Sequence, residues 1–219
     1  MKKEKLDKVD RRSVMSGLGV AALAGAALGS TSASAQTSSN KFEPKRHTLD
    51  DWMTEIPGVH RVFIDTSDAA GGANAPRYCS NILNAHINEY EGSLDEMAMI
   101  ICYRHASTPF GFNDAMWEKY GDSFANFTQQ RGPDGEAPKT NTLLSSINEL
   151  AEKGVHFAIC NTATKLTSRM LAGPAGLDAD EVYAELIANA IPNAHFVPAG
   201  VMAVTRAQEH GYSLLYSAA

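Results

Sequence analysis

One segment of the chain passes from a helical pattern to a strand pattern and back: Gly154-Val155-His156-Phe157-Ala158-Ile159-Cys160-Asn161-Thr162-Ala163-Thr164-Lys165. The glycine is a typical helix stop, and the apolar run after it is typical of a short buried strand. Cys160 therefore stands at the carboxyl end of a strand and just before a helix. Open α/β sheets bind ligands at this edge, and helix amides there favour a thiolate. The alternative interpretation is a buried, inert thiol, because free cysteine packs as a small hydrophobic residue.

The same alternation of strands and helices extends along the chain on both sides of this segment. The apolar runs predict five strands, at residues 60–66, 97–105, 154–160, 194–197 and 211–216. Helical spacing of apolar residues predicts the connecting segments, at residues 75–90, 113–127, 141–153, 162–171, 178–190 and 201–210. Strands that alternate with helices predict an α/β fold in three layers, α/β/α, around a mostly parallel five-stranded sheet.

The second predicted strand is apolar on both faces. Met97, Met99, Ile101 and Tyr103 alternate with Ala98, Ile100 and Cys102. Such a strand is typical of the centre of a parallel sheet that is covered on both sides. Cys102 is therefore expected to be buried, whereas Arg104 and His105 follow at the same sheet edge as Cys160. Asp65 ends the first strand at this edge as well.

The first 35 residues are interpreted as an export signal. Four lysines precede Arg11 and Arg12, a run rich in glycine and alanine follows, and Ala33-Ser34-Ala35 fits a small-residue cleavage site. The apolar run is too short and too weakly hydrophobic for a membrane anchor. The paired arginines resemble a twin-arginine signal, which predicts a periplasmic protein with no membrane span after cleavage. Residues 36–57 are interpreted as a linker and residues 58–219 as the domain.

Composition excludes several function classes. Removal of residues 1–35 takes away six basic and three acidic side chains, so that 13 Lys and Arg remain against 22 Asp and Glu and the net charge changes from −6 to −9. Such a surface repels phosphate backbones, so nucleic acid is not an expected partner. The three cysteines match no zinc-ligand spacing, and the chain lacks the Gly-x-Ser-x-Gly and HExxH motifs of hydrolases. The sequence predicts no metal and no resident cofactor.

Several further patterns are assigned structural roles. Gly71-Gly72 is interpreted as a plain turn, because no GxGxxG pattern follows it. Cys79 and His86 are too far apart along a helix to share a metal ion. An aromatic stripe from Trp117 to Phe127 is expected to face the core. Residues 128–139 are expected to form an exposed loop, long enough to act as a lid or an interface arm.

Two stretches together resemble the DsrE/DsrF-like proteins. They are residues 154–160, quoted above, and later Val197-Pro198-Ala199-Gly200-Val201 with Gln208-Glu209-His210-Gly211-Tyr212. The resemblance spans residues 58–217, and residues 104–117 resemble only a subset of exported relatives. It implies a three-layer fold with a five-stranded parallel sheet, assembled as trimers or hexamers. Sulfur-relay members of this family carry a persulfide on a cysteine at the position that Cys160 occupies here.

Two hypotheses follow for the function. In the first, the chain is an exported homo-oligomer that accepts or carries sulfur on Cys160, with a small sulfur species as its partner. Arg104, His105, Asn161 and Gly200 are then predicted to bind the anionic ligand, because a cation and helix amides stabilise a thiolate or persulfide. In the second, the chain is a non-catalytic ligand-binding or assembly module. That module uses residues 104–117, and Cys160 only packs.

Overall fold

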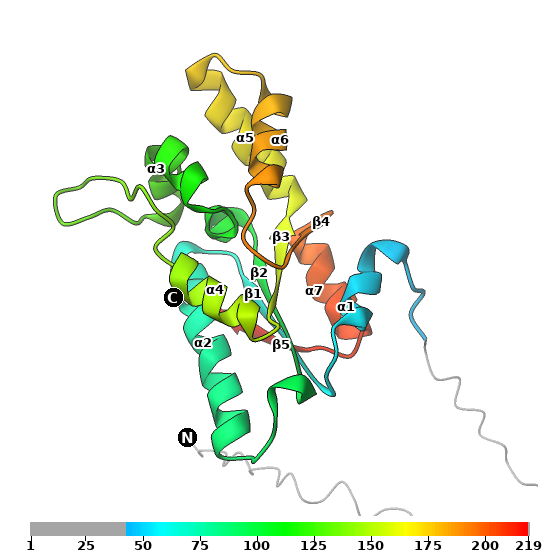
Figure 1. Ribbon diagram of the computed structural model, residues 1–219. Helices are drawn as coiled ribbons and strands as arrows, with labels where there is room; N and C mark the ends of the chain where they lie inside the picture. The colour runs from blue at the N-terminus through cyan, green and yellow to red at the C-terminus, as the bar shows by residue number, and fades with distance from the viewer. Residues whose placement is uncertain (1–42, 219) are drawn as a thin grey trace, which may run out of the picture. The chain divides into compact units, whose positions relative to one another are not determined.

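The computed structural model describes residues 43–218, so the predicted signal at residues 1–35 lies outside the described residues. Five strands form one sheet (Figure 1): β1 (His60–Thr66), β2 (Met97–Tyr103), β3 (His156–Cys160), β4 (Ala194–Val197) and β5 (Ser213–Ser217). Their order is β4-β3-β2-β1-β5, and every neighbouring pair is parallel. The predicted fold class is confirmed, and the sheet is parallel throughout.

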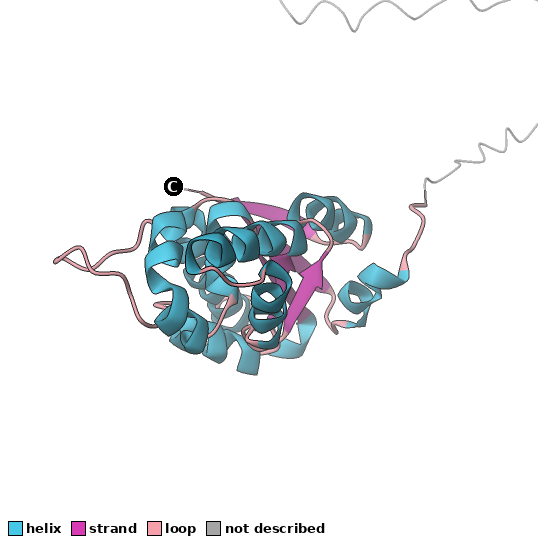
Figure 2. Ribbon diagram, turned by 90° about the horizontal axis from the view of Figure 1, so that it is seen from above, coloured by secondary structure: helices cyan, strands magenta, loops and turns pink. Residues whose placement is uncertain are grey.

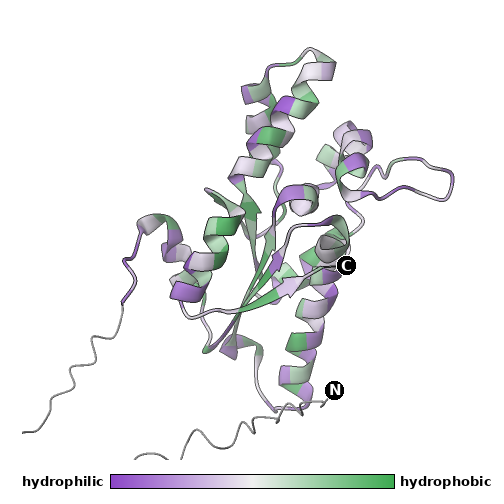
Figure 3. Cartoon of the chain, turned by 180° about the vertical axis from the view of Figure 1, so that it is seen from behind, coloured by the Kyte–Doolittle hydropathy of each residue, from purple (hydrophilic) through white to green (hydrophobic). Residues whose placement is uncertain are grey.

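Helices cover both faces of the sheet (Figure 2). Within residues 43–218 they are α1 (Asp51–Glu55), α2 (Ala69–Asn88), α3 (Asp114–Thr128), α4 (Leu144–Glu152), α5 (Asn161–Ala175), α6 (Ala179–Ala188) and α7 (Gly200–Glu209). One core cluster contains side chains of α2 to α6, and a second, on the opposite face, contains side chains of α1 and α7. In Figure 3 the central strands are largely coloured as hydrophobic, as a sheet buried between two helical layers requires.

The two clusters divide the residues of β2 as the sequence predicts. Met97, Met99, Ile101 and Tyr103 lie in the first cluster, and Ala98, Ile100 and Cys102 lie in the second. All seven residues of this strand are buried. The strand is therefore central, and the polar residues that follow it come out in the middle of the carboxyl edge.

Helix α2 corrects one sequence prediction. It begins at Ala69, capped by the carboxylate of Asp68, so Gly71-Gly72 lies in its first turn and does not form a separate turn. A Cβ at Gly71 would lie 2.1 Å from the carbonyl oxygen of Ser217, and one at Gly72 would lie 2.6 Å from Ser107 Cβ. The two glycines let the helix start pack directly against β5 and the segment after β2.

Helix α5 also differs from its prediction. Gly173-Pro174 was expected to end it, but the helix continues to Ala175 and ends at Gly176, whose φ is +65°. Proline removes a single hydrogen bond, to the carbonyl of Met170, and this residue is exposed, so that water can replace the bond. Helices α5 and α6 lie side by side and extend beyond the sheet edge (Figure 1).

The second half of the expected linker belongs to the domain. A 3-10 turn at Thr48–Asp50 leads into α1, and the side chains of Met53 and Ile56 are buried in the second core cluster. The Met53 carbonyl accepts hydrogen bonds from Arg61 Nη1 (2.8 Å) and the Tyr212 hydroxyl (2.7 Å). These contacts hold α1 on the sheet, although its short, mixed sequence shows no sustained period.

A pair of histidines lies under α1, His195 on the edge strand β4 and His156 on its neighbour β3. His156 Nδ1 and His195 Nε2 are 2.9 Å apart, and the Trp52 ring stacks on His195 with centroids 3.9 Å apart. Burial lowers the pKa of both imidazoles; for His195 the neighbouring His156 adds to the effect, and the pKa is about 4. Both rings are therefore neutral near pH 7. In residues 43–218, no helix is long and apolar enough to cross a bilayer.

Candidate functional site

Cys160 lies where two helix N-termini meet. It ends β3 and caps α5, and its Sγ accepts hydrogen bonds from the backbone N–H groups of Ala163 (3.4 Å) and Gly200 (3.2 Å). Gly200 is the first residue of α7, so both donors carry the positive end of a helix dipole. Backbone amides and helix N-termini stabilise negative charge on sulfur. The predicted junction of Cys160 and Gly200 is thus observed.

Gly200 is required by a close approach. A Cβ at this position would lie 2.7 Å from Cβ and 2.8 Å from Cδ of Arg104. The stem of the arginine therefore occupies the space that a side chain would need, and only glycine lets α7 begin next to both Arg104 and the sulfur of Cys160.

Arg104 is held in a bidentate ion pair. Its Nε and Nη2 donate to Oδ1 and Oδ2 of Asp65 at 2.8 and 2.7 Å, and both side chains are largely buried. These hydrogen bonds to the carboxylate raise the pKa of Arg104 above its ordinary value. The convergence of Arg104 and Asp65 at the sheet edge is as predicted. The charge of the guanidinium is, however, matched within the protein.

His105 has a left-handed backbone, with φ of +53°, and its side chain is exposed. The residues around it are fixed by hydrogen bonds. Ser107 Oγ accepts from the Arg104 N–H (3.0 Å) and lies 2.8 Å from Thr66 Oγ1, while the Ala106 N–H donates to the Ser67 carbonyl (3.1 Å). A non-glycine residue at positive φ persists only where its surroundings impose it, and such residues gather at functional sites.

A cavity of about 510 Å³ opens above the sulfur of Cys160. It is lined by residues from the end of β2, the end of α3 and the starts of α5 and α7: Arg104, His105, Ala106, Asn126, Phe127, Cys160, Thr162, Ala163, Leu166, Thr167, Ala199, Gly200 and Val201. Cys160 is only 4% exposed, so a reagent reaches it through this cavity. Both the volume and the prevalence of apolar side chains are typical of a small-molecule site.

Four of the five predicted site residues line this cavity, and one does not. Cys160, Arg104, His105 and Gly200 are brought together at the carboxyl edge. Asn161 faces α6 instead, where its Oδ1 accepts a hydrogen bond from the Tyr183 hydroxyl at 2.7 Å. This contact links the start of α5 to α6. Its role in the geometry is to position the helix that carries the Ala163 amide.

The other two thiols lie in the core. Burial raises the pKa of Cys79 to about 12. Burial also raises the pKa of Cys102 well above the ordinary value, and the carboxylate of Asp65 acts in the same direction. Neither residue lines a described cavity. Among the three cysteines, Cys160 alone combines an amide-bonded sulfur with a path from the surface.

The aromatic stripe of α3 is divided between the core and the site. Trp117 is fully buried, and its Nε1 donates to the Pro109 carbonyl at 3.1 Å. Phe127, which was also expected to face the core, is only partly buried and forms a wall of the cavity. Phe127 continues the helical spacing of the stripe, so no sequence signal marks this difference. Leu166 and Val201 were missed, because single apolar residues on helices carry no such signal.

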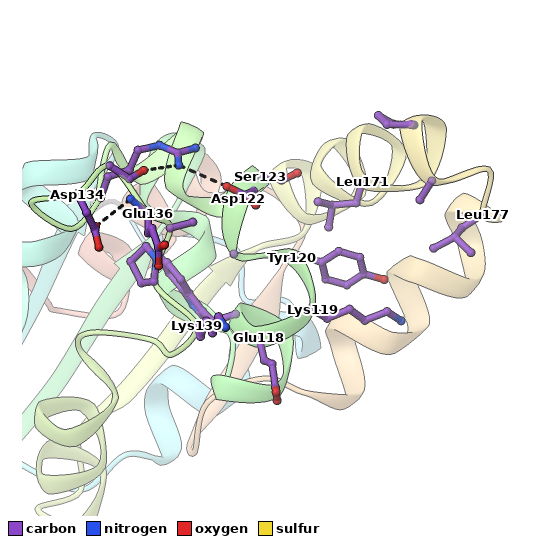
Figure 4. A pocket seen from close by; sticks show the side chains of 18 residues that line it. Glu118, Lys119, Tyr120, Asp122, Ser123, Asp134, Glu136, Lys139, Leu171 and Leu177 are labelled. Atoms are coloured by element: carbon purple, nitrogen blue, oxygen red, sulfur yellow. Dashed lines mark hydrogen bonds and ion pairs between the residues drawn. The ribbon is translucent and has the colours of Figure 1, made fainter.

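A second hollow, of about 850 Å³, lies between α3, residues 131–139 and the α5–α6 pair (Figure 4). Some of the charged side chains on its walls are paired within the protein. Lys119 Nζ lies 2.6 Å from Glu185 Oε1, the Tyr120 hydroxyl donates to Glu185 Oε2 at 2.7 Å, and Arg131 contacts Asp122. The loop expected at residues 128–139 therefore borders this hollow, and none of its residues lines the cavity at Cys160. Among residues 43–218, no three His, Cys, Asp or Glu side chains group as metal ligands.

No protein-family model matches the chain, and a comparison with curated proteins finds no significant match. Among solved structures, one similar chain is a protein of unknown function, MTH1491, from Methanobacterium thermoautotrophicum. The two are 14% identical, the match covers 72% of this chain and 98% of that chain, and the TM-score is 0.40. At this level of similarity no functional argument follows.

Proposed function

We propose that this protein handles sulfur through Cys160, which accepts a sulfur atom as a persulfide and passes it on. The observation that carries the proposal is the position of Cys160 Sγ, which lies at the base of a ligand-sized cavity and accepts hydrogen bonds from the amides of Ala163 and Gly200. The same two donors that stabilise a thiolate also stabilise the anionic persulfide. The resemblance to DsrE/DsrF-like proteins supports the same chemistry.

The proposed step is a transfer of sulfane sulfur. The Cys160 thiolate attacks the outer sulfur of a donor R–S–SH, and a new S–S bond forms as the donor's S–S bond breaks. The sulfur of R–S⁻ leaves with the electron pair and takes the proton from the new Cys160–S–SH, which yields R–SH and the Cys160 persulfide anion. The step requires no external oxidant, since the donor already holds sulfur at the sulfane level.

Mass spectrometry that maps the modification of each cysteine tests the proposal. The purified protein is incubated with an organic persulfide, and adducts of 32 Da are mapped after trapping with an alkylating reagent. We expect the adduct on Cys160, while Cys79 and Cys102 serve as internal controls because both are fully buried and, unlike Cys160, do not line the cavity. Cys160→Ser should give no adduct. The proposal is wrong if Cys160 remains unmodified under conditions that modify free cysteine.

A second candidate function is a non-catalytic binding module. It is favoured by two observations: the cavity walls are mainly apolar, and Cys160 itself is only 4% exposed. In this case the thiol contributes to packing, and Cys160→Ala keeps full ligand affinity and the same oligomeric state. A loss of sulfur transfer in Cys160→Ala without a loss of binding would separate the two functions.

Export and assembly are part of the proposal. Cleavage after Ala35 would deliver residues 36–219 to the periplasm, and the mass of the protein recovered from that compartment tests it. A homo-oligomer, a trimer or hexamer, is supported by apolar side chains exposed outside the cavity on α7 and β5, namely Met202, Leu214 and Tyr216. Light scattering of the processed protein measures the oligomeric state, and a monomer would contradict this part.

A further inference from the structure

We infer that the compound which meets Cys160 has an apolar organic body, as in an alkyl or aryl persulfide, and is not an inorganic sulfur anion such as thiosulfate. The inference rests on the proposed function and narrows the class of its substrate. It is drawn from three properties of the cavity: the chemistry of its walls, the pairing of its charges and the position of its hydrogen-bond donors.

The walls of the cavity are apolar where a ligand body would lie. Phe127 from α3, Leu166 from α5 and Val201 from α7 line the cavity together with Cys160, as do the small apolar residues Ala163 and Ala199. Leu166 and Val201 are each 55% exposed, so they present apolar surface that a bound ligand would cover. Burial of each additional methylene group is worth about 0.8 kcal/mol, which corresponds to roughly fourfold in affinity.

The basic side chains that line the cavity offer little unpaired positive charge to an inorganic anion. Arg104 and His105 are the basic residues among those that line the cavity. Two nitrogen atoms of Arg104 are already bonded to the carboxylate of Asp65, which balances the guanidinium charge. His105 is exposed at the surface. A doubly charged anion would therefore lose its hydration among apolar side chains without gaining a matching cation.

Two backbone hydrogen-bond donors of the cavity lining are directed at the sulfur. They are the amides of Ala163 and Gly200, which donate to Cys160 Sγ, and the apolar side chains of Phe127 and Leu166 line the same cavity. This arrangement fits an amphipathic ligand whose sulfur end lies at Cys160. The volume of about 510 Å³ is several times that needed for a hydrosulfide or thiosulfate, and it accommodates an organic body.

Binding measurements on the Cys160→Ser protein test the ligand class without sulfur transfer. The probes are straight-chain alkanethiols from propanethiol to hexanethiol, with thiosulfate as the inorganic arm, measured by calorimetry. We expect affinity to rise roughly fourfold for each methylene group, and thiosulfate to bind more weakly than hexanethiol by at least tenfold. Affinity that does not depend on chain length, or thiosulfate binding as tight as that of hexanethiol, overturns the inference.

Matched variants locate the binding at the cavity. Leu166→Gln should weaken hexanethiol binding roughly tenfold or more, because it removes apolar wall. Met170→Gln changes an equally exposed residue of α5 that does not line the cavity, and it should leave binding unchanged. Equal effects of the two substitutions would contradict the assigned wall.

The wild-type protein separates a failure of the inference from a failure of the proposed function. Rates of persulfide formation on Cys160 are compared for hexyl persulfide and for inorganic polysulfide. A faster reaction with the organic donor supports both the proposed function and the organic ligand class. Equal rates contradict the ligand class but are consistent with sulfur transfer on Cys160. If neither donor modifies Cys160, the proposed function falls, and the chain-length dependence of binding still decides the ligand class.

Discussion

Acidification is expected to destabilise the fold through the pair formed by His156 and His195. The two rings share a contact of 2.9 Å, and Trp52 from α1 stacks on His195. A hydrogen bond between two imidazoles requires at least one neutral ring. Protonation of both rings would break this bond and place two repelling cations next to each other under the Trp52 ring. The group that faces His195 across this contact is another base, His156, which disfavours a charge on His195.

The sign and size of the effect follow from the pKa of His195. Burial, with a smaller effect of His156, lowers this pKa from 6.5 to about 4 in the folded protein. As the pH falls below 6.5, His195 binds a proton in the unfolded chain but not in the folded protein. Its contribution to the free energy of unfolding is therefore fully present above pH 6.5 and is lost as the pH falls towards 4. The full difference is equivalent to ~3.4 kcal/mol. Because the pair is half-buried and partly screened by water, we expect about 1–2 kcal/mol.

Urea unfolding at about pH 7.5 and pH 4.5 measures the effect. His195→Gln removes the titrating ring, so it should lose ~1–2 kcal/mol less than the wild-type protein between the two pH values. His47→Gln is the matched control, because it removes an exposed imidazole, and its pH dependence should equal that of the wild-type protein. Carboxylates titrate alike in all three proteins and cancel in the comparison. If His195→Gln has the same pH dependence as the wild-type protein, the reasoning is refuted.

Four further substitutions test the site and the packing around it. Gly200→Ala would force a Cβ against Arg104, so we expect a loss of ~1–3 kcal/mol in urea unfolding and a several-fold slower alkylation of Cys160. Arg104→Met leaves the carboxylate of Asp65 buried without its partner and should cost ~3–5 kcal/mol. The double variant with Asp65→Leu should recover a large part of that loss, and a double variant no more stable than the single one would contradict the pairing. Met53→Ala should cost ~2–5 kcal/mol by thermal unfolding if α1 belongs to the core, and an effect below ~1 kcal/mol would argue against it.

The parts of the fold that could be predicted are those with a local cause. The alternation along β2 assigns its residues to two faces, because successive side chains of a strand point to opposite sides. The edge at which Asp65, Arg104 and Cys160 meet follows from the direction of parallel strands alone. Cys102, expected to be buried, is indeed fully buried. Each of these predictions follows from the patterns of the strands alone.

The parts that could not be predicted depend on contacts between distant segments. Gly71-Gly72 resembles a turn until the end of β5 is known to lie against it. The partial exposure of Phe127 depends on the cavity that α5 and α7 leave open beside it. The stacking of Trp52 on His195 joins residues 143 positions apart in the sequence, and no local sequence pattern predicts it.

Alkylation of the native protein tests the central claim most directly, because the claim is that Cys160 is the accessible, reactive thiol of the three. The folded protein is exposed to iodoacetamide for increasing times, and the modified fraction of each cysteine is measured by mass spectrometry. We predict that Cys160, which lines the cavity, is alkylated first and completely, while Cys79 and Cys102 react only after unfolding in urea. A Cys160 that reacts as slowly as Cys102 in the folded protein would contradict the account.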